Sequence, residues 1–135
     1  MLGEQIGELT GKTTGNRVLP GEDGRHVKIE TSWELSGTVL GTAASDIGTI
    51  VSFERVPGQL FSEGQGVLMT EAGGAIYSGS GVGSVGEGMS IQLRFAVTFQ
   101  AGGDGPLARL NSVVGVGEFE TDAEGNVTAR IWEWK

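Results

Sequence analysis

The sequence contains no cysteine, only one histidine and only three prolines. The absence of cysteine excludes a disulfide scaffold and thiol chemistry, and it fits a reducing compartment. With a single histidine and no cysteine, a structural zinc site or a Ser/His/Asp triad has almost no material to build on. We therefore expect neither a metal nor a cofactor.

Basic residues are also scarce, because nine lysines and arginines stand against seventeen acidic residues, for a net charge of −8. This charge repels phosphate backbones and anionic lipid surfaces, so we expect no nucleic-acid partner and no membrane partner. The opening residues MLGEQIGELTGK lack a basic region and an apolar core, and no run of apolar residues approaches membrane-spanning length. The expected location is cytoplasmic.

Helical periodicity is missing as well, whereas apolar and polar residues alternate along most of the chain. The clearest alternation covers residues 89–99, and a second covers residues 27–35. Both are typical of half-buried strands. We predict strands at residues 5–19, 25–40, 46–56, 60–72, 75–86, 88–100, 112–121 and 126–134.

Only the segment 103–111 lacks strand character, and residues 106–110 within it can form one short helical turn. No domain boundary interrupts the pattern, so we predict a single all-β domain over residues 1–135. Eight sequential antiparallel strands in so short a chain must hide their edges, and closing into a barrel does so completely. The predicted fold is an eight-stranded antiparallel closed β-barrel.

The glycine-rich stretch at residues 73–88 contains the spacing GxGxxG at Gly81, Gly83 and Gly86. A nucleotide-binding loop of this kind leads into a helix, whereas here a strand follows, so we reject that interpretation. Two-residue turns at residues 73–74 and 87–88 would place Gly81 beside Arg94. The glycines then leave one face of three neighbouring strands nearly bare, and Tyr77 shares that face with Arg94.

The opposite face of these strands is mostly apolar and is expected to point into the barrel. In the fourth strand it includes Glu63 and Gln65, and a carboxylate in an apolar interior is costly unless it is paired or functional. Glu63 is our candidate acid or base, and Gln65 would orient a carbonyl or hydroxyl group. Alternatively, Glu63 lies near the barrel mouth, solvated or paired with Arg55. A one-residue slip in register would turn both candidates outward.

The remaining candidates concern ligand contacts and self-association. The wall of the expected pocket is formed by Phe61, Met69, Phe95 and Phe99, and weaker ligand-binding candidates are Tyr77 and Arg94. Trp132 and Trp134 flank Glu133 on one face of the last strand, and they either close one end of the barrel or enter an interface. We favour the interface and therefore expect a homo-oligomer.

Three segments carry a resemblance to a family of small, uncharacterised bacterial proteins: DIGTIVSFERVPGQLFSEGQGVLMT, GSGVG and GVGEFETDAEGNVTARIWEWK. The resemblance covers most of the chain and implies no known activity. In strand number and glycine placement the sequence is more distantly similar to the allene oxide cyclase and dirigent barrels, which have a calycin-like layout. That second likeness implies a cofactor-free cyclase-like barrel and association through the outer barrel wall, and it assigns no residues.

Three functions fit these observations. The leading hypothesis is a barrel that binds a small, largely apolar molecule. The second is a cofactor-free cyclase or isomerase acting on a hydrophobic substrate, with Glu63 as general acid or base. The third is a structural or assembly protein whose barrel is fully packed.

Overall fold

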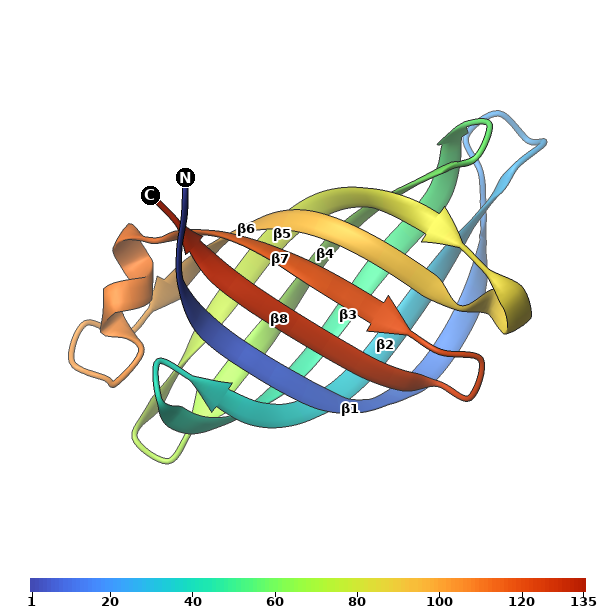
Figure 1. Cartoon of the computed structure of the whole chain (residues 1–135). Helices are drawn as coiled ribbons and strands as arrows, with labels where there is room; N and C mark the ends of the chain where they lie inside the picture. Colours follow the sequence, from blue (N-terminus) through green and yellow to red (C-terminus); the bar gives the residue numbers. More distant parts are fainter.

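The alternating segments form eight strands in the computed structural model, which describes residues 1–135 (Figure 1). The strands are β1 (Leu2–Pro20), β2 (Val27–Val39), β3 (Thr42–Val56), β4 (Gln59–Thr70), β5 (Gly73–Val85), β6 (Ile91–Ala101), β7 (Val114–Thr121) and β8 (Asn126–Trp134). Two short 3₁₀ helices interrupt the connections, η1 (Glu87–Met89) after β5 and η2 (Ala108–Ser112) after β6. Neither is long and apolar enough to cross a membrane.

The strands follow one another around a closed barrel in chain order, and every neighbouring pair is antiparallel. β8 returns to pair with β1, for example between Thr128 and Thr10, which closes the cylinder. The predicted closed eight-stranded antiparallel barrel is therefore confirmed, and closure leaves no strand edge unpaired. One barrel accounts for the chain from Leu2 to Trp134.

The two ends of the barrel differ. At one end, which we call the η2 end, both termini meet, and the Lys135 amide donates to the Met1 carbonyl at 2.6 Å (Figure 1). Leu107 and Leu110, in and just before η2, are fully buried there and belong to the hydrophobic core. The opposite end, the η1 end, carries the β1–β2 hairpin and η1, and η1 buries none of its residues.

The register between β4 and β5 differs from the prediction. Thr70 pairs with Gly73, so the turn consists of residues 71–72 instead of 73–74. The Thr70 hydroxyl supports this turn by donating to the Gly73 carbonyl at 2.6 Å. Gly64 consequently pairs with Gly79 instead of Gly83, a shift of four residues. Because this shift is even, it preserves which residues of β4 and β5 share a face.

The register between β5 and β6 is wrong by one residue, and this error has the larger consequence. The predicted two-residue turn at 87–88 is replaced by η1, whose ends are joined by the Gly86 amide donating to the Ser90 carbonyl at 2.8 Å. Arg94 therefore pairs with Val82 and not with Gly81. A slip of one residue moves every side chain of β5, and with it β4, to the other face.

The inner wall of the barrel is accordingly lined with glycine on β4 and β5. On β6 the predicted inward residues Leu93 and Phe99 are buried, as expected. Opposite them the inward residues of β5 include Gly79 and Gly81, and the outward ones include Val82, which is 40% exposed. The bare face predicted for the outside lies inside, where bulky side chains from other strands fill it.

Candidate functional site

The inner wall carries one buried carboxyl group, that of Asp46 on β3, which is 4% exposed. Its Oδ2 accepts a hydrogen bond from Trp33 Nε1 of β2 at 2.9 Å. Its Oδ1 accepts one from the Tyr77 hydroxyl of β5 at 2.8 Å. Residues of two other strands, β2 and β5, thus converge on a single acid of β3, and both carboxyl oxygens have a partner.

Glycines make this convergence possible. Trp33 pairs with Gly48, Gly48 with Gly66, and Gly66 with Tyr77, so two glycines separate the two aromatic residues in one row across four strands. A Cβ atom added at Gly48 would lie 2.5 Å from the Trp33 ring and well inside 3.0 Å of the Tyr77 hydroxyl. Both aromatic side chains therefore lean over bare backbone, and this brings their donors to Asp46.

The environment of Asp46 disfavours its charged form. Burial raises the pKa of the Asp46 carboxyl above its usual 3.8, although the hydrogen bonds from Trp33 and Tyr77 oppose the rise. Burial also raises the pKa of the Tyr77 hydroxyl, and the neighbouring Asp46 charge raises it further, so the hydroxyl stays protonated. Titratable groups with perturbed pKa values are concentrated at functional sites.

An internal cavity of about 80 Å³ lies beside this cluster. Its wall includes the carboxyl of Asp46 and five of the nine aromatic residues of the chain. These five are Trp33, Tyr77, Phe95, Phe99 and Phe119. The rest of the wall is formed by aliphatic side chains, by glycine and by Ser62 and Ser80. No lysine, arginine or histidine lines it.

A second buried polar group lies closer to the η1 end. Ser52 of β3 and Ser62 of β4 are cross-strand neighbours, and their hydroxyl oxygens are 2.6 Å apart. Both side chains are buried. This pair satisfies itself without a charge, whereas the Asp46 cluster contains an ionisable group.

Three of the sequence-predicted ligand contacts do line the cavity, namely Tyr77, Phe95 and Phe99. Tyr77 does so from the face opposite to the expected one, because of the slip between β5 and β6. Phe95 lies between Gly81 of β5 and Gly117 of β7 in another aromatic–glycine row. The role of these three residues in binding stays a prediction.

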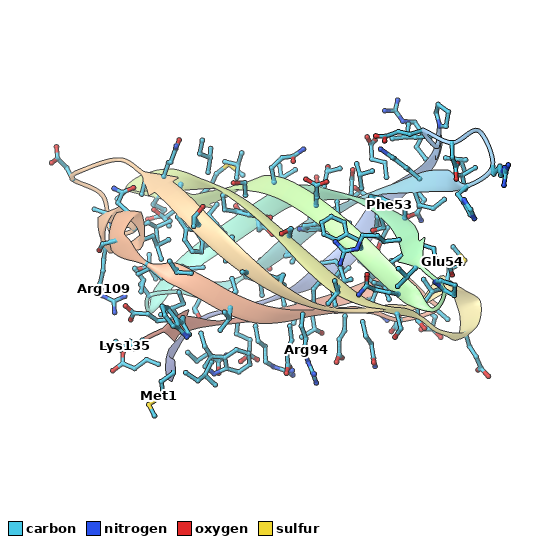
Figure 2. All side chains as sticks on the ribbon, turned by 90° about the horizontal axis from the view of Figure 1, so that it is seen from above. Met1, Phe53, Glu54, Arg94, Arg109 and Lys135 are labelled. Atoms are coloured by element: carbon cyan, nitrogen blue, oxygen red, sulfur yellow. The ribbon has the colours of Figure 1, made fainter.

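The other predicted site residues lie on the outer wall. Glu63 and Gln65 are exposed, so their expected position in the barrel interior is wrong, and the reason is the one-residue slip. Met69 is 40% exposed. Arg94 points away from the barrel (Figure 2). Phe61 packs edge-on against Phe53 on the outside, with ring centroids 5.6 Å apart.

Sequence reasoning missed Asp46 and gave Trp33 no role in the site. Asp46 alternates in step with Gly48, Ile50 and Ser52, but the adjacent Ile47 and Val51 are also apolar, so the alternation of β3 does not reveal its inner face. Trp33 alternates with Leu35 in a strand that the sequence predicts to be half-buried. The one signal in the sequence that could have revealed the site was therefore an acid, Asp46, within the strand that follows the strand of Trp33.

The structure contains no group of three or more histidine, aspartate or glutamate side chains that could hold a metal ion. The hydrogen-bond donors around the Asp46 carboxyl are the indole N–H of Trp33 and the phenol hydroxyl of Tyr77.

Fold and site together define a closed eight-stranded antiparallel barrel with a single acid in an aromatic interior. No protein-family model matches the sequence, and neither does any curated protein. Two solved structures share the fold over nearly the whole of both chains. One is a protein of unknown function from Clostridium acetobutylicum ATCC 824, with a TM-score of 0.76, 13% identity, and coverage of 98% of each chain.

The other is a conserved protein of unknown function from Rhodopseudomonas palustris, with a TM-score of 0.76 and 14% identity. The match covers 98% of this chain and 97% of that one. At such low identity the likeness concerns the fold alone. The chain is thus similar to barrel proteins of unknown function.

Proposed function

We propose that this protein binds a small molecule inside the barrel, with Asp46 as its polar anchor. The observation that carries the proposal is the cavity of about 80 Å³ that places a buried acid against an otherwise apolar, aromatic wall. Pockets that bind small molecules combine such a wall with a few convergent polar groups. Here the convergent group is the Asp46 carboxyl, oriented by Trp33 and Tyr77.

The size of the cavity restricts the ligand. Drug-sized ligands occupy pockets of about 300 Å³ or more. An engineered apolar cavity of roughly 150 Å³ binds benzene. The present cavity, at about 80 Å³, is smaller than both. The ligand is therefore a molecule of only a few non-hydrogen atoms.

Indole N–H resonances test the proposal directly, because one tryptophan lies inside the barrel and two lie outside. Trp33 is buried at the cavity, whereas Trp134 is 59% exposed and Trp132 lies beside it on β8. We would titrate the ¹⁵N-labelled protein with short-chain alcohols, amines, acids and hydrocarbons. Saturable shifts of the Trp33 signal, with those of Trp132 and Trp134 unmoved, are the expected result.

A matched pair of variants separates binding inside from binding outside. Ala129 lines the cavity, so Ala129→Leu fills it and should abolish the Trp33 shifts. Ala96→Leu adds the same atoms on the exposed outer wall and should leave the shifts unchanged. If no compound class moves the Trp33 resonance of the wild-type protein, the proposal is overturned.

The cyclase or isomerase hypothesis has lost the residue on which it depended. It assigned the acid–base step to Glu63 in the pocket, and Glu63 lies on the outer wall.

The expectation of a homo-oligomer has an observation in its favour. Ile47, Val67 and Ile76 are neighbours on the outer faces of β3, β4 and β5, and each is at least 41% exposed.

We further propose that a second copy of the chain covers this outer wall. Glu63 on β4 and Arg94 on β6 flank β5 on the same wall, and neither forms an ion pair within the chain. In a twofold interface each contact occurs twice, so Glu63 of one copy can face Arg94 of the other and the reverse. A barrel that serves mainly for such assembly corresponds to the third function considered above.

Native mass spectrometry at several concentrations tests the assembly. A dimer in the wild-type protein that becomes a monomer in Val67→Lys, and is retained in Thr10→Lys on the distant outer wall of β1, is the expected result. A wild-type monomer at every concentration would overturn it.

A further inference from the structure

The Asp46 carboxyl has no cationic partner anywhere in the barrel. Arginine, lysine and histidine form ion pairs only with Glu22, Asp23, Glu30, Glu118 and Glu133, and none of these lines the cavity. Among the cavity-lining residues only Asp46 and Tyr77 can ionise. A buried carboxylate without a compensating positive charge is destabilising. When Asp46 is ionised, the interior therefore contains a negative charge that no side chain compensates.

The hydrogen bonds around Asp46 suit a carboxylate that still has capacity to accept. Trp33 and Tyr77 each donate to a different oxygen, which fixes the plane of the carboxyl group. An ionised carboxylate has about four lone-pair sites, and these two donors use two of them. The remaining sites can accept further hydrogen bonds from an N–H group in the cavity.

The aromatic wall provides a second element of recognition. The Trp33 and Phe119 rings lie 4.8 Å apart, the Tyr77 and Phe99 rings lie 6.5 Å apart, and all four residues line the cavity. Ring faces attract cations, and sites lined by several aromatic rings bind alkylated ammonium groups in other proteins. A carboxylate within such a site provides the opposite charge.

We propose that the ligand is a small organic cation, a short alkylammonium or methylated ammonium ion, held between the Asp46 carboxylate and the surrounding aromatic rings. The inference rests on the proposed function and adds the charge and class of the ligand. The cavity of about 80 Å³ admits only a few non-hydrogen atoms. The net charge of −8 attracts cations to the protein and repels anions.

Other ligand chemistries fit these observations less well. A carboxylate ligand would place a second negative charge beside Asp46. A neutral alcohol would satisfy lone pairs but would leave the Asp46 charge uncompensated in an apolar interior. The cation is the one class that matches the acid, the rings and the net charge together.

Three compounds of nearly equal size separate these classes: n-propylammonium, n-propanol and propanoate. Binding is followed by the Trp33 indole N–H resonance and by calorimetry in two buffers of different ionisation enthalpy. We expect n-propylammonium to bind at least tenfold more tightly than n-propanol, and propanoate not to bind. Because a cation favours the ionised carboxyl, its binding should also release a proton from the fraction of Asp46 that is protonated.

Asp46→Asn removes the charge with little change in shape and should lower the affinity for n-propylammonium by about tenfold to a hundredfold. Glu63→Gln makes the same chemical change on the outer wall and should leave the affinity unchanged. If Asp46→Asn fails to fold, the comparison of the three compounds on the wild-type protein still decides. Preferential binding of n-propanol would overturn the cation and keep binding in the cavity. Binding of none of the three would overturn the cation, and it would overturn binding in the cavity as well if hydrocarbons also leave the Trp33 resonance unmoved.

Discussion

The Asp46 cluster and the Ser52–Ser62 pair are both buried polar groups of the same barrel wall, yet they are built differently. The two serines are cross-strand neighbours on β3 and β4, and each satisfies the other. Asp46 needs donors from β2 and β5, which reach it only over Gly48 and its neighbour on β4. The serine pair therefore needs only two adjacent strands, whereas the acid requires an arrangement of four strands beside a cavity.

The Ser52–Ser62 pair fits into the wall without special features of the neighbouring strands. The Asp46 cluster, in contrast, needs glycines on two strands to bring its donors into place. A neutral hydroxyl pair can be replaced by apolar groups at small cost, because nothing charged is left behind. An ionisable group in an apolar interior is destabilising unless it is compensated, and such groups are common at functional sites. The following variants test this distinction.

The largest effect is expected for Gly48→Ala. The new Cβ would overlap both the Trp33 ring and the Tyr77 hydroxyl, so both donors of Asp46 must move. We expect the free energy of unfolding to fall by about 3 kcal/mol in urea titrations. Gly15→Ala is the control, because a Cβ there meets nothing within 4 Å, and it should change stability by less than about 0.5 kcal/mol. Equal effects of the two variants would contradict the account.

Tyr77→Phe removes one of the two donors and keeps the ring. The Asp46 Oδ1 atom is then left without its partner in a buried position, so we expect a loss of about 2 kcal/mol at neutral pH. Urea titration measures the loss, and ¹⁵N spectra of the Trp33 indole show whether the second hydrogen bond survives. A stability equal to that of the wild-type protein would mean that the hydroxyl contributes nothing to holding the acid.

Stability should also depend on pH through Asp46. Its pKa in the folded protein is raised above 3.8, so between 3.8 and the raised value the folded chain holds a proton that the unfolded chain has lost. The stability that this proton contributes is complete below pH 3.8 and is lost as the pH rises through that window. Between pH 3.8 and the raised pKa, the free energy of unfolding of the wild-type protein should fall, relative to that of Asp46→Asn, by up to about 1.4 kcal/mol per pH unit. Parallel stability curves for the two proteins would contradict this expectation.

Ser62→Ala breaks the hydroxyl pair and leaves Ser52 without a partner. A loss of about 1 kcal/mol is expected from thermal or urea unfolding. The double variant Ser52→Ala/Ser62→Ala should be more stable than this single variant, because no unpaired hydroxyl remains. A double variant that is less stable than Ser62→Ala would show that the Ser52 hydroxyl stabilises the fold through something other than its hydrogen bond with Ser62.

The smallest effect is expected for Glu63→Gln. Its side chain is exposed on the outer wall, so the free energy of unfolding should change by less than about 0.5 kcal/mol. A large loss of stability in the monomer would show that Glu63 makes a contact within the fold.

Much of the fold could be predicted from the sequence, because alternation along strands is a local property. The inward set on β6 is confirmed, and so is the half-buried strand predicted at residues 27–35, where Trp33 and Leu35 are buried. Closure into an eight-stranded antiparallel barrel followed from strand number and is also confirmed. A short 3₁₀ helix, η2, lies at the one segment that lacked alternation.

The site could not be predicted in the same way, because it depends on register between strands. β5 consists largely of glycine and small polar residues, so composition marks neither of its faces, and the inner face of β4 follows from its pairing with β5. Their orientation is set by η1, where Gly88 and Met89 adopt positive φ angles of 63° and 65°. Met89 is a residue type from which such a conformation is not expected. That one turn decided whether Glu63 or Tyr77 faces the interior.

The account depends most directly on the ionisation of Asp46 inside the barrel. A ¹³C NMR titration of the Asp46 carboxyl carbon, recorded without and with n-propylammonium, measures it. We predict a midpoint above 3.8 in the free protein that falls when the cation is added, because the cation stabilises the carboxylate. A midpoint at or below 3.8 that n-propylammonium does not move would contradict the account.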